Sequence, residues 1–180
     1  MGDDGARNIV KINKGPVTRT KTGNYKLVLP KDHCEVLTHL ITELRDSLLN
    51  TTDDASLRRL FPTAYHNDAI KDAEYQRLMR DELLASRLAS IETALEVIGA
   101  SNELSDSEID AFARSINSLR LVIGTTLDIA ESDHGELNIE SRQSKSPETE
   151  SDEEKLIHGE LYDYLGWLLE WTVSAQSEGL

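Results

Sequence analysis

Residues 84–98, LASRLASIETALEVI, decide the fold of this chain because apolar side chains recur there at alternating intervals of four and three residues. That spacing aligns them along one side of an α-helix, as the seam of a helix that packs nearly parallel or antiparallel to a neighbour. We predict a helix over residues 68–98, since Gly99 is of the type that commonly ends helices. The seam consists of Leu84, Leu88, Ile91, Leu95 and Ile98.

Other segments repeat apolar residues at helical spacing on both sides of this helix. They cover residues 31–50, 105–130 and 155–175. The second of them opens with a capping box, in which Ser105 and Glu108 can each bond to the backbone of the other. We predict one shared core, made of Leu37, Leu40, Ile41, Leu44, Leu88, Ile91, Leu95, Ile116, Leu119, Ile123, Leu161, Leu165 and Leu168.

The first thirty residues predict a small β-hairpin. Ile9–Ile12 and Tyr25–Leu29 are rich in residues that favour strands, and Gly-containing turn sequences lie between them. Six basic and two acidic residues give this segment a local charge of +4. We therefore expect an exposed basic tip at residues 14–21.

Together these elements predict a mainly α protein, a four-to-five-helix bundle with a small N-terminal β-hairpin. Nine acidic residues face only two basic ones in residues 131–154, a composition that buries too little apolar surface to order itself. We expect a single domain over residues 1–180. Its parts are the hairpin at 1–30, helices at 31–130, an acidic mobile loop at 131–154 and a C-terminal helix at 155–175.

The composition excludes several classes of protein. The 180 residues carry 33 acidic and 19 basic side chains, a formal net charge of -14, which disfavours a general nucleic-acid-binding surface. A single Cys excludes an internal disulfide and fits a reducing compartment. No stretch approaches the roughly 20 apolar residues that a membrane span needs. We expect a soluble, cytoplasmic protein with no membrane contact.

Motifs for metals, cofactors and catalysis are weak. Glu35 and His39 lie four residues apart on a predicted helix, as do Glu154 and His158, but two ligands make an incomplete metal site. The glycine-rich phosphate-binding motifs are absent. We therefore predict no metal, cofactor or catalytic residue.

Cys34 is the candidate redox thiol, and its chemistry has two interpretations. Its place near a helix N-terminus favours a thiolate. Asp32 and Glu35 oppose thiolate formation, which favours instead a half-buried, unreactive side chain.

The run LYDYLGWLLEW at residues 161–171 contains both tryptophans, Trp167 and Trp171, on one side of a predicted helix, while leucines line another side. A helix that is apolar on two sides is either central in the fold or buries its second side against another molecule. Both interpretations remain open at this point.

Five motifs carry a resemblance to a known family: RLFPTAY (59–65), EYQRL (74–78), DEL (81–83), NSLRLVIGT (117–125) and LYDYLGWL (161–168). They resemble an actinobacterial family, the domain of unknown function twenty-seventeen, whose members are often encoded beside the ClpS adaptor. The resemblance implies no agreed enzymatic activity, although some members, the AosR-like proteins, are described as redox-responsive transcriptional regulators. Because Cys34 has no second cysteine, such control would here need a mixed or intermolecular disulfide.

Six polar residues lie in or beside these motifs and flank the apolar seams. We interpret them as an ion network that either fixes the helix packing or lines a binding groove. They are Arg59, Tyr65, Glu74, Arg77, Asp81 and Arg120.

We expect a non-enzymatic regulatory or adaptor protein that acts through protein contacts, with partners that include the transcription machinery, and that forms a homodimer. One alternative is a DNA-binding transcriptional regulator; another is a small-molecule-binding enzyme that uses Glu74, Arg77 and Asp81. The candidate partner surface combines the basic tip with the aromatic run: Lys14, Arg19, Lys21, Trp167 and Trp171.

Overall fold

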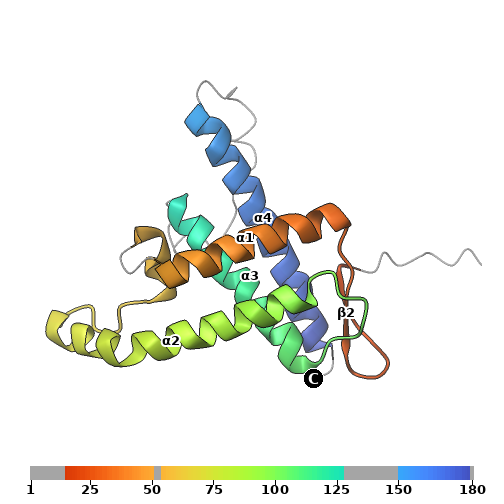
Figure 1. Ribbon diagram of the computed structural model, residues 1–180, viewed down its shortest axis with the longest axis horizontal. Coiled ribbons are helices and arrows are strands. Elements are labelled where there is room, and N and C mark those ends of the chain that lie inside the picture. The colour runs from red at the N-terminus through yellow and green to blue at the C-terminus, as the bar shows by residue number, and fades with distance from the viewer. Residues whose placement is uncertain (1–14, 51–53, 128–149, 179–180) are drawn as a thin grey trace, which may run out of the picture.

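The computed structural model describes residues 15–50, 54–127 and 150–178 (Figure 1). The described residues form a mainly α fold with an N-terminal hairpin, which confirms the predicted fold class. The elements are, in chain order, β1 (Val17–Arg19), β2 (Tyr25–Leu27), α1 (Lys31–Asn50), the 3-10 helix η1 (Ala55–Leu60), α2 (Ala69–Val97), α3 (Asp106–Thr126) and α4 (Glu150–Ser177).

The hairpin is antiparallel, but its first strand is not the predicted one. Val17 lies opposite Leu27, in a segment that we expected to be part of the exposed tip. The expectation of an exposed segment is wrong there because Val17, only 1% exposed, contributes its side chain to the core. The predicted strand Ile9–Ile12 lies outside the described residues. The turn that joins the two strands places Gly23 at a φ of 90°, which favours glycine.

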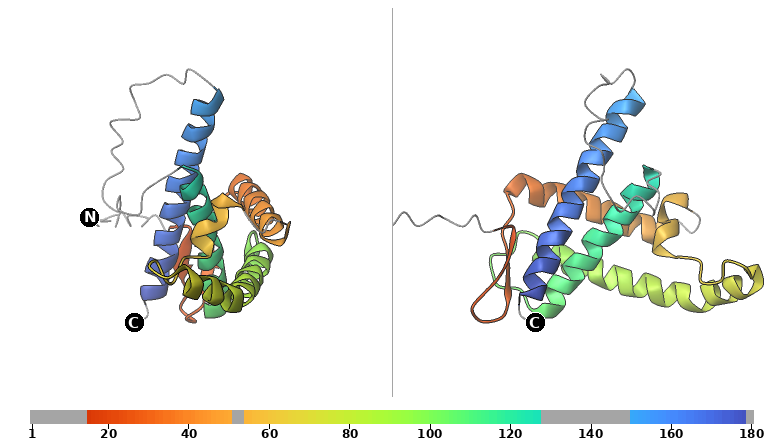
Figure 2. Two further views of the ribbon diagram at one scale, coloured as in Figure 1. Left: turned by 90° about the vertical axis from the view of Figure 1, so that its left-hand side faces the viewer. Right: turned by 180° about the vertical axis from the view of Figure 1, so that it is seen from behind.

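Helix α3 forms the centre of the fold, with α2 and α4 packed along it (Figure 2). The predicted capping box is present: the Ser105 side chain accepts from the Glu108 backbone, and the Glu108 carboxylate accepts from the Ser105 backbone. Ten residues of α3 are buried. Because α3 is covered on several sides, its buried residues contribute to the core contacts of α1, α2, α4 and η1.

The predicted core residues all belong to one hydrophobic cluster or pack against it. Four of them are only half-buried: Leu40, Leu88, Leu95 and Leu161. The cluster also contains residues that helical spacing alone did not identify, among them Tyr25 and Leu104.

The hairpin is joined to the loop between α2 and α3. The backbones of Tyr25 and Leu104 exchange two hydrogen bonds of 2.8 Å, and the Tyr25 hydroxyl donates to the Asp106 carboxylate at 2.8 Å. Tyr25 is 2% exposed, so this joint is buried. The hairpin is thus seated on the helices, as a two-stranded hairpin requires for stability.

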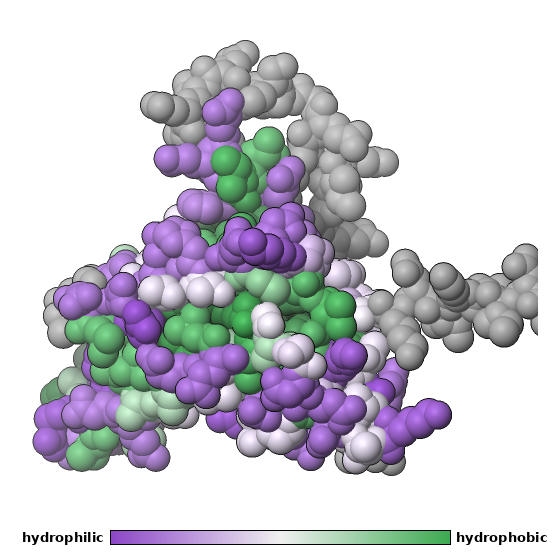
Figure 3. Space-filling model, turned by 45° about the vertical axis from the view of Figure 1, so that its right-hand side comes forward, coloured by the Kyte–Doolittle hydropathy of each residue, from purple (hydrophilic) through white to green (hydrophobic). Residues whose placement is uncertain are grey.

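Two helix ends project from the packed body. The first half of α2 extends to one side and the first turns of α4 extend upward (Figures 1 and 2). Helix α4 begins at Glu150, five residues before the predicted start at residue 155. Most of the predicted acidic loop falls within residues 128–149, which lie outside the described residues. Figure 3 shows hydrophobic side chains on the projecting end of α4, where Leu156 and Ile157 are exposed.

None of the helices in the described part of the chain combines the length and the apolar character needed to cross a membrane.

Candidate functional site

An aromatic pair on α4 lies at the surface of the packed body. The ring centroids of Tyr164 and Trp167 are 5.8 Å apart, with an angle of 30° between the ring planes. Trp167 is 44% exposed, although a large apolar ring usually gains free energy from burial. The indole is therefore presented to solvent on a preformed aromatic support.

His33, in the first turns of α1, holds Tyr164 in place. Its Nδ1 lies 3.0 Å from the Tyr164 hydroxyl, and the two rings meet edge to face with centroids 5.1 Å apart. Burial raises the pKa of Tyr164 to about 12, and the charges of Cys34 and Asp32 act in the same direction. The phenol is consequently neutral near pH 7 and can donate its proton to His33.

Cys34 is the neighbour of this pair. It is half-buried, and its thiol lies 3.9 Å from the Leu29 carbonyl, to which it donates. Burial raises the pKa of the Cys34 thiol, and Asp32 raises it further. The thiol is therefore protonated at neutral pH, a state with low nucleophilicity.

Trp171, one turn after Trp167, has a different environment. A Cβ atom at Gly15 would overlap the Trp171 ring, so the indole covers the base of the hairpin at a position where only glycine fits. Of the two tryptophans, Trp171 is packed within the chain and Trp167 is presented outward. Trp171 thus fits the interpretation of a helix that is central in the fold, while a contact of Trp167 with another molecule stays a prediction.

The hairpin tip makes contacts within the chain. Thr20, Thr22 and Asn24 donate to the Glu103 carboxylate, with the shortest distance, 2.7 Å, from the Thr22 hydroxyl. These hydrogen bonds, led by that from Thr22, lower the pKa of Glu103, and the nearby Lys26 charge has the same effect. The polar tip is thus held against the α2–α3 loop.

The basic residues of the predicted partner surface are placed around this tip. Lys21 is exposed, and the Arg19 guanidinium lies 5.6 Å from the centre of the Tyr25 ring. Lys14 lies outside the described residues. The described basic residues of the tip and Trp167 thus belong to different elements, the hairpin and α4.

The six polar residues that were predicted as one network occupy separate places. Glu74, Arg77 and Asp81 are exposed on the projecting half of α2. Tyr65 lies before α2, with its ring 6.3 Å from the ring of Tyr75. The enzyme alternative relied on the first three of these, and the structure places them on a convex helix surface.

Arg59 and Arg120 lie elsewhere, where α3 meets η1 and α4. The Arg120 guanidinium stacks over the Tyr162 ring at 4.3 Å. A Cβ atom at Gly124 would lie 2.9 Å from Tyr162 and 3.4 Å from Arg59, so glycine permits this close packing. The arrangement resembles a structural contact between helices more than a groove.

The pairing of His33 with Tyr164 was not predicted from the sequence, where the histidines were considered as metal ligands or catalytic groups. The aromatic run from Tyr162 to Trp171 was the available signal, since its tyrosine hydroxyls need partners once they are buried. Among the described residues, no group of three or more His, Cys, Asp or Glu side chains is placed to hold a metal ion.

A family model described as Domain of unknown function (DUF2017) matches residues 14–176, which is nearly the whole chain. No curated protein and no solved structure matches the chain.

Proposed function

The chain belongs to the family of the domain of unknown function DUF2017, which assigns no activity, and we propose from its surface that it is a non-enzymatic regulatory or adaptor protein. The observation that supports this proposal is the exposed indole of Trp167 on its support of Tyr164 and His33. Tryptophan and tyrosine are enriched in the energetic centres of protein interfaces. A ring that is already fixed loses little entropy when a partner covers it.

The proposal extends to the setting of the protein. We place it in the cytoplasm because its single Cys suits a reducing compartment. The resemblance to regulators supports partners in transcriptional or stress control, including the transcription machinery. We also propose a homodimer, in which the hairpin or Trp167 contacts a second copy.

Neither alternative function gains support from a specific observation. A DNA-binding regulator would need a helix free to enter the major groove. Helix α3, which follows the capping box and carries Arg114 and Arg120, is instead the most covered helix of the described chain. An enzyme would need its reacting groups to converge on a common centre.

The test is a photoreactive amino acid at position 167 of the full chain, expressed in its native cell, with the same substitution at Val173 as the control. Val173 is on the same helix and is 50% exposed, so it matches Trp167 in accessibility. We expect a discrete crosslinked partner from position 167 that is absent from position 173. Trp167→Ala should weaken capture of that same partner by at least about tenfold, the usual effect of losing an interface centre.

The proposal is wrong if the two positions give the same crosslinks or if Trp167→Ala captures every partner as the wild type does. The homodimer is tested separately by sedimentation at micromolar concentration. A monomer of 20.1 kDa would contradict the homodimer and leave the adaptor proposal standing.

A further inference from the structure

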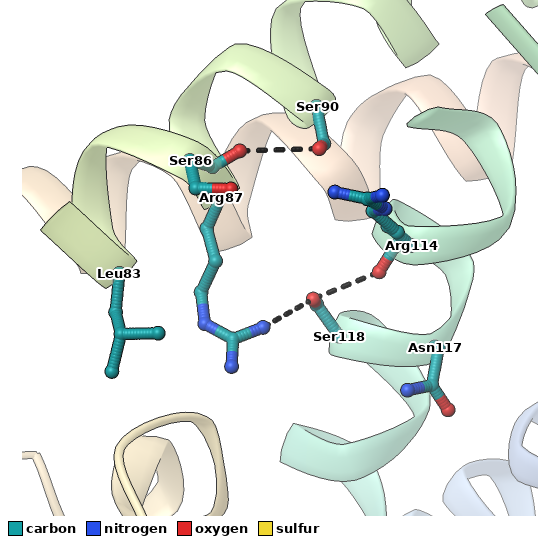
Figure 4. Close-up of a pocket in the computed structure, with 7 residues that line it drawn as sticks. All are labelled: Leu83, Ser86, Arg87, Ser90, Arg114, Asn117 and Ser118. Carbon is teal, nitrogen blue, oxygen red and sulfur yellow. Dashed lines mark hydrogen bonds between the residues drawn. The ribbon is translucent and has the colours of Figure 1, made fainter. Parts of the chain in front are cut away.

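A small polar cavity of about 200 Å³ lies between the second half of α2 and α3 (Figure 4). It is distinct from the aromatic surface, which belongs to α4 and α1. Its polar lining comes from both helices: Ser86, Arg87 and Ser90 from α2, and Arg114, Asn117 and Ser118 from α3.

Arg87 is fixed in this cavity by two hydrogen bonds. Its guanidinium donates to the Ser118 hydroxyl at 3.1 Å and to the Leu60 carbonyl at 2.6 Å. The Ser118 hydroxyl in turn donates to the Arg114 carbonyl at 2.9 Å, so its lone pairs are available to Arg87. The cation therefore has a defined position before any ligand arrives, which lowers the entropic cost of binding.

Among the described residues, Arg87 has no carboxylate partner, although its guanidinium lies 5.9 Å from the centre of the Phe61 ring. Both oxygens that it bonds are uncharged, and none of the described residues that line the cavity is an Asp or a Glu. Its Nε is buried without a hydrogen-bond partner among the described residues. Burial lowers the pKa of Arg87, which reflects the cost of holding a cation away from water.

A second arginine reaches the same cavity. Arg114 extends from α3 toward α2 in Figure 4, while it also forms an ion pair of 2.7 Å with Asp110, one turn earlier on its own helix. Asp110 does not line the cavity. The described lining thus contains two arginines and no carboxylate, and Arg114 is already paired with Asp110 just outside it, within a protein whose formal net charge is -14.

We propose that this cavity binds a small oxyanion, the carboxylate or phosphate group of a small acid. Guanidinium groups match the geometry of both kinds of oxyanion, and Asn117 is a further polar residue of the lining. The volume suits a group of a few atoms, since pockets for larger ligands usually measure about 300–1,000 Å³. An anion there would neutralise Arg87 without breaking its bonds to Ser118 and Leu60.

The simplest competing explanation is that Arg87 only connects helices. Its bonds join η1 to α2 and α3, a structural role that Arg87 keeps under both explanations. Arg114 separates the two explanations, because its side chain is 62% exposed and the connection between helices does not depend on it.

The experiment measures thermal unfolding of the full chain against inorganic phosphate and, separately, acetate, with ionic strength held constant by sodium chloride. A ligand that binds the folded state raises Tm in a saturable way. The variants are Arg114→Gln and, as a matched control, Arg45→Gln, which removes an ion-paired arginine from α1 instead. We expect saturation with at least one anion, unchanged in Arg45→Gln and weakened about tenfold or more in Arg114→Gln, because a charged hydrogen bond is lost.

The two anions distinguish a phosphate from a carboxylate as the preferred group. The proposal is overturned if neither anion stabilises the protein beyond chloride, or if both variants respond alike.

A second measurement uses the wild-type protein, so it does not depend on how a variant folds. The Arg87 Nε–H resonance, followed by NMR during the same titration, should shift with the same saturation as the Tm. A resonance that stays unchanged while the anion saturates would place the binding site elsewhere and would contradict the assignment to this cavity.

Discussion

The two halves of α2 form one continuous helix in very different surroundings. In the second half, Ile91, Ala94 and Val97 are buried between α1 and α3. In the first half, which projects from the body, Ile70 is 83% exposed and Leu78 is 60% exposed (Figure 1). The same kind of apolar residue is thus part of the core at one end and in contact with water at the other.

The difference shows what the apolar spacing can decide. Spacing of three and four residues identifies a helix and the side of it that is apolar. Whether a given turn is buried depends on which other elements reach it, and only the second half of α2 has both α1 and α3 beside it. The stability of the protein should therefore depend unequally on the two halves.

The largest expected effect is at Ile91, which is 1% exposed. Ile91→Ala should lower the free energy of unfolding by about 2–5 kcal/mol, since it removes buried methyl groups and leaves a cavity. Urea denaturation followed by circular dichroism measures it. A loss below about 0.5 kcal/mol, typical of surface positions, would remove the distinction between the two halves.

The next largest effect on stability is expected from the residues that cap the helices. The Ser105 side chain caps α3 inside the body, and the Asp68 side chain caps the projecting start of α2. Ser105→Ala should reduce global stability by about 1 kcal/mol. Asp68→Ala should act locally, because an end with few tertiary contacts can fray by itself.

Hydrogen exchange distinguishes these outcomes. We expect Asp68→Ala to speed exchange in the first turns of α2 while the urea midpoint stays close to that of the wild type. Equal losses of global stability from the two cap variants would show that the projecting half unfolds together with the body.

The pH dependence of the free energy of unfolding extends the comparison to Tyr164, in the packed half of α4. The pKa of Tyr164 rises from its ordinary 10.0 to about 12 in the folded protein. Between these pH values the unfolded chain loses the phenol proton first, so ionisation favours unfolding. The contribution of the protonated Tyr164 phenol to stability is complete below pH 10 and is lost as the pH rises toward 12.

Urea unfolding at a series of pH values from about 9 to 12 measures this loss. Tyr164→Phe should make the decline in stability shallower over that interval, because its ring has no proton to lose. An unchanged slope in the variant would contradict the assignment of the raised pKa to Tyr164.

The smallest expected effect is at Leu78. Leu78→Ala should change the free energy of unfolding by no more than about 0.5 kcal/mol, because its side chain is already mostly in water. The same denaturation experiment serves here, with Ile91→Ala on the same helix as the reference. A loss comparable to that of Ile91→Ala would mean that another molecule covers the projecting half in solution.

Much of the fold could be predicted from local patterns. The helices have strong signals at their ends, such as the Ser105 capping box and the Asp68 cap, and these mark boundaries through contacts between neighbours in sequence. The first strand was misplaced because its position depends on a distant contact. Val17 is a strand residue only because the core receives its side chain, and no local pattern encodes that core.

The candidate sites were less accessible to prediction. The aromatic run marked Trp167 as a candidate partner residue without deciding whether it is exposed, and the contact of His33 with Tyr164 joins residues 131 positions apart. Arg87 lies beside the apolar seam, one residue before Leu88, and a charge at such a position is the signal that could have identified the cavity. Its partners, Leu60 and Ser118, come from two other elements.

The contact between the hairpin and the α2–α3 loop also affects how the chain folds while it is being synthesised. The ribosome delivers the hairpin first, but Thr20 and Glu103 are separated by 83 positions, so the strand edge that Leu104 pairs stays open during most of the synthesis of α1 and α2. An open edge can pair with other nascent chains. The timing of translation and the protection given by chaperones therefore matter for the hairpin, whose pairing partner is made late.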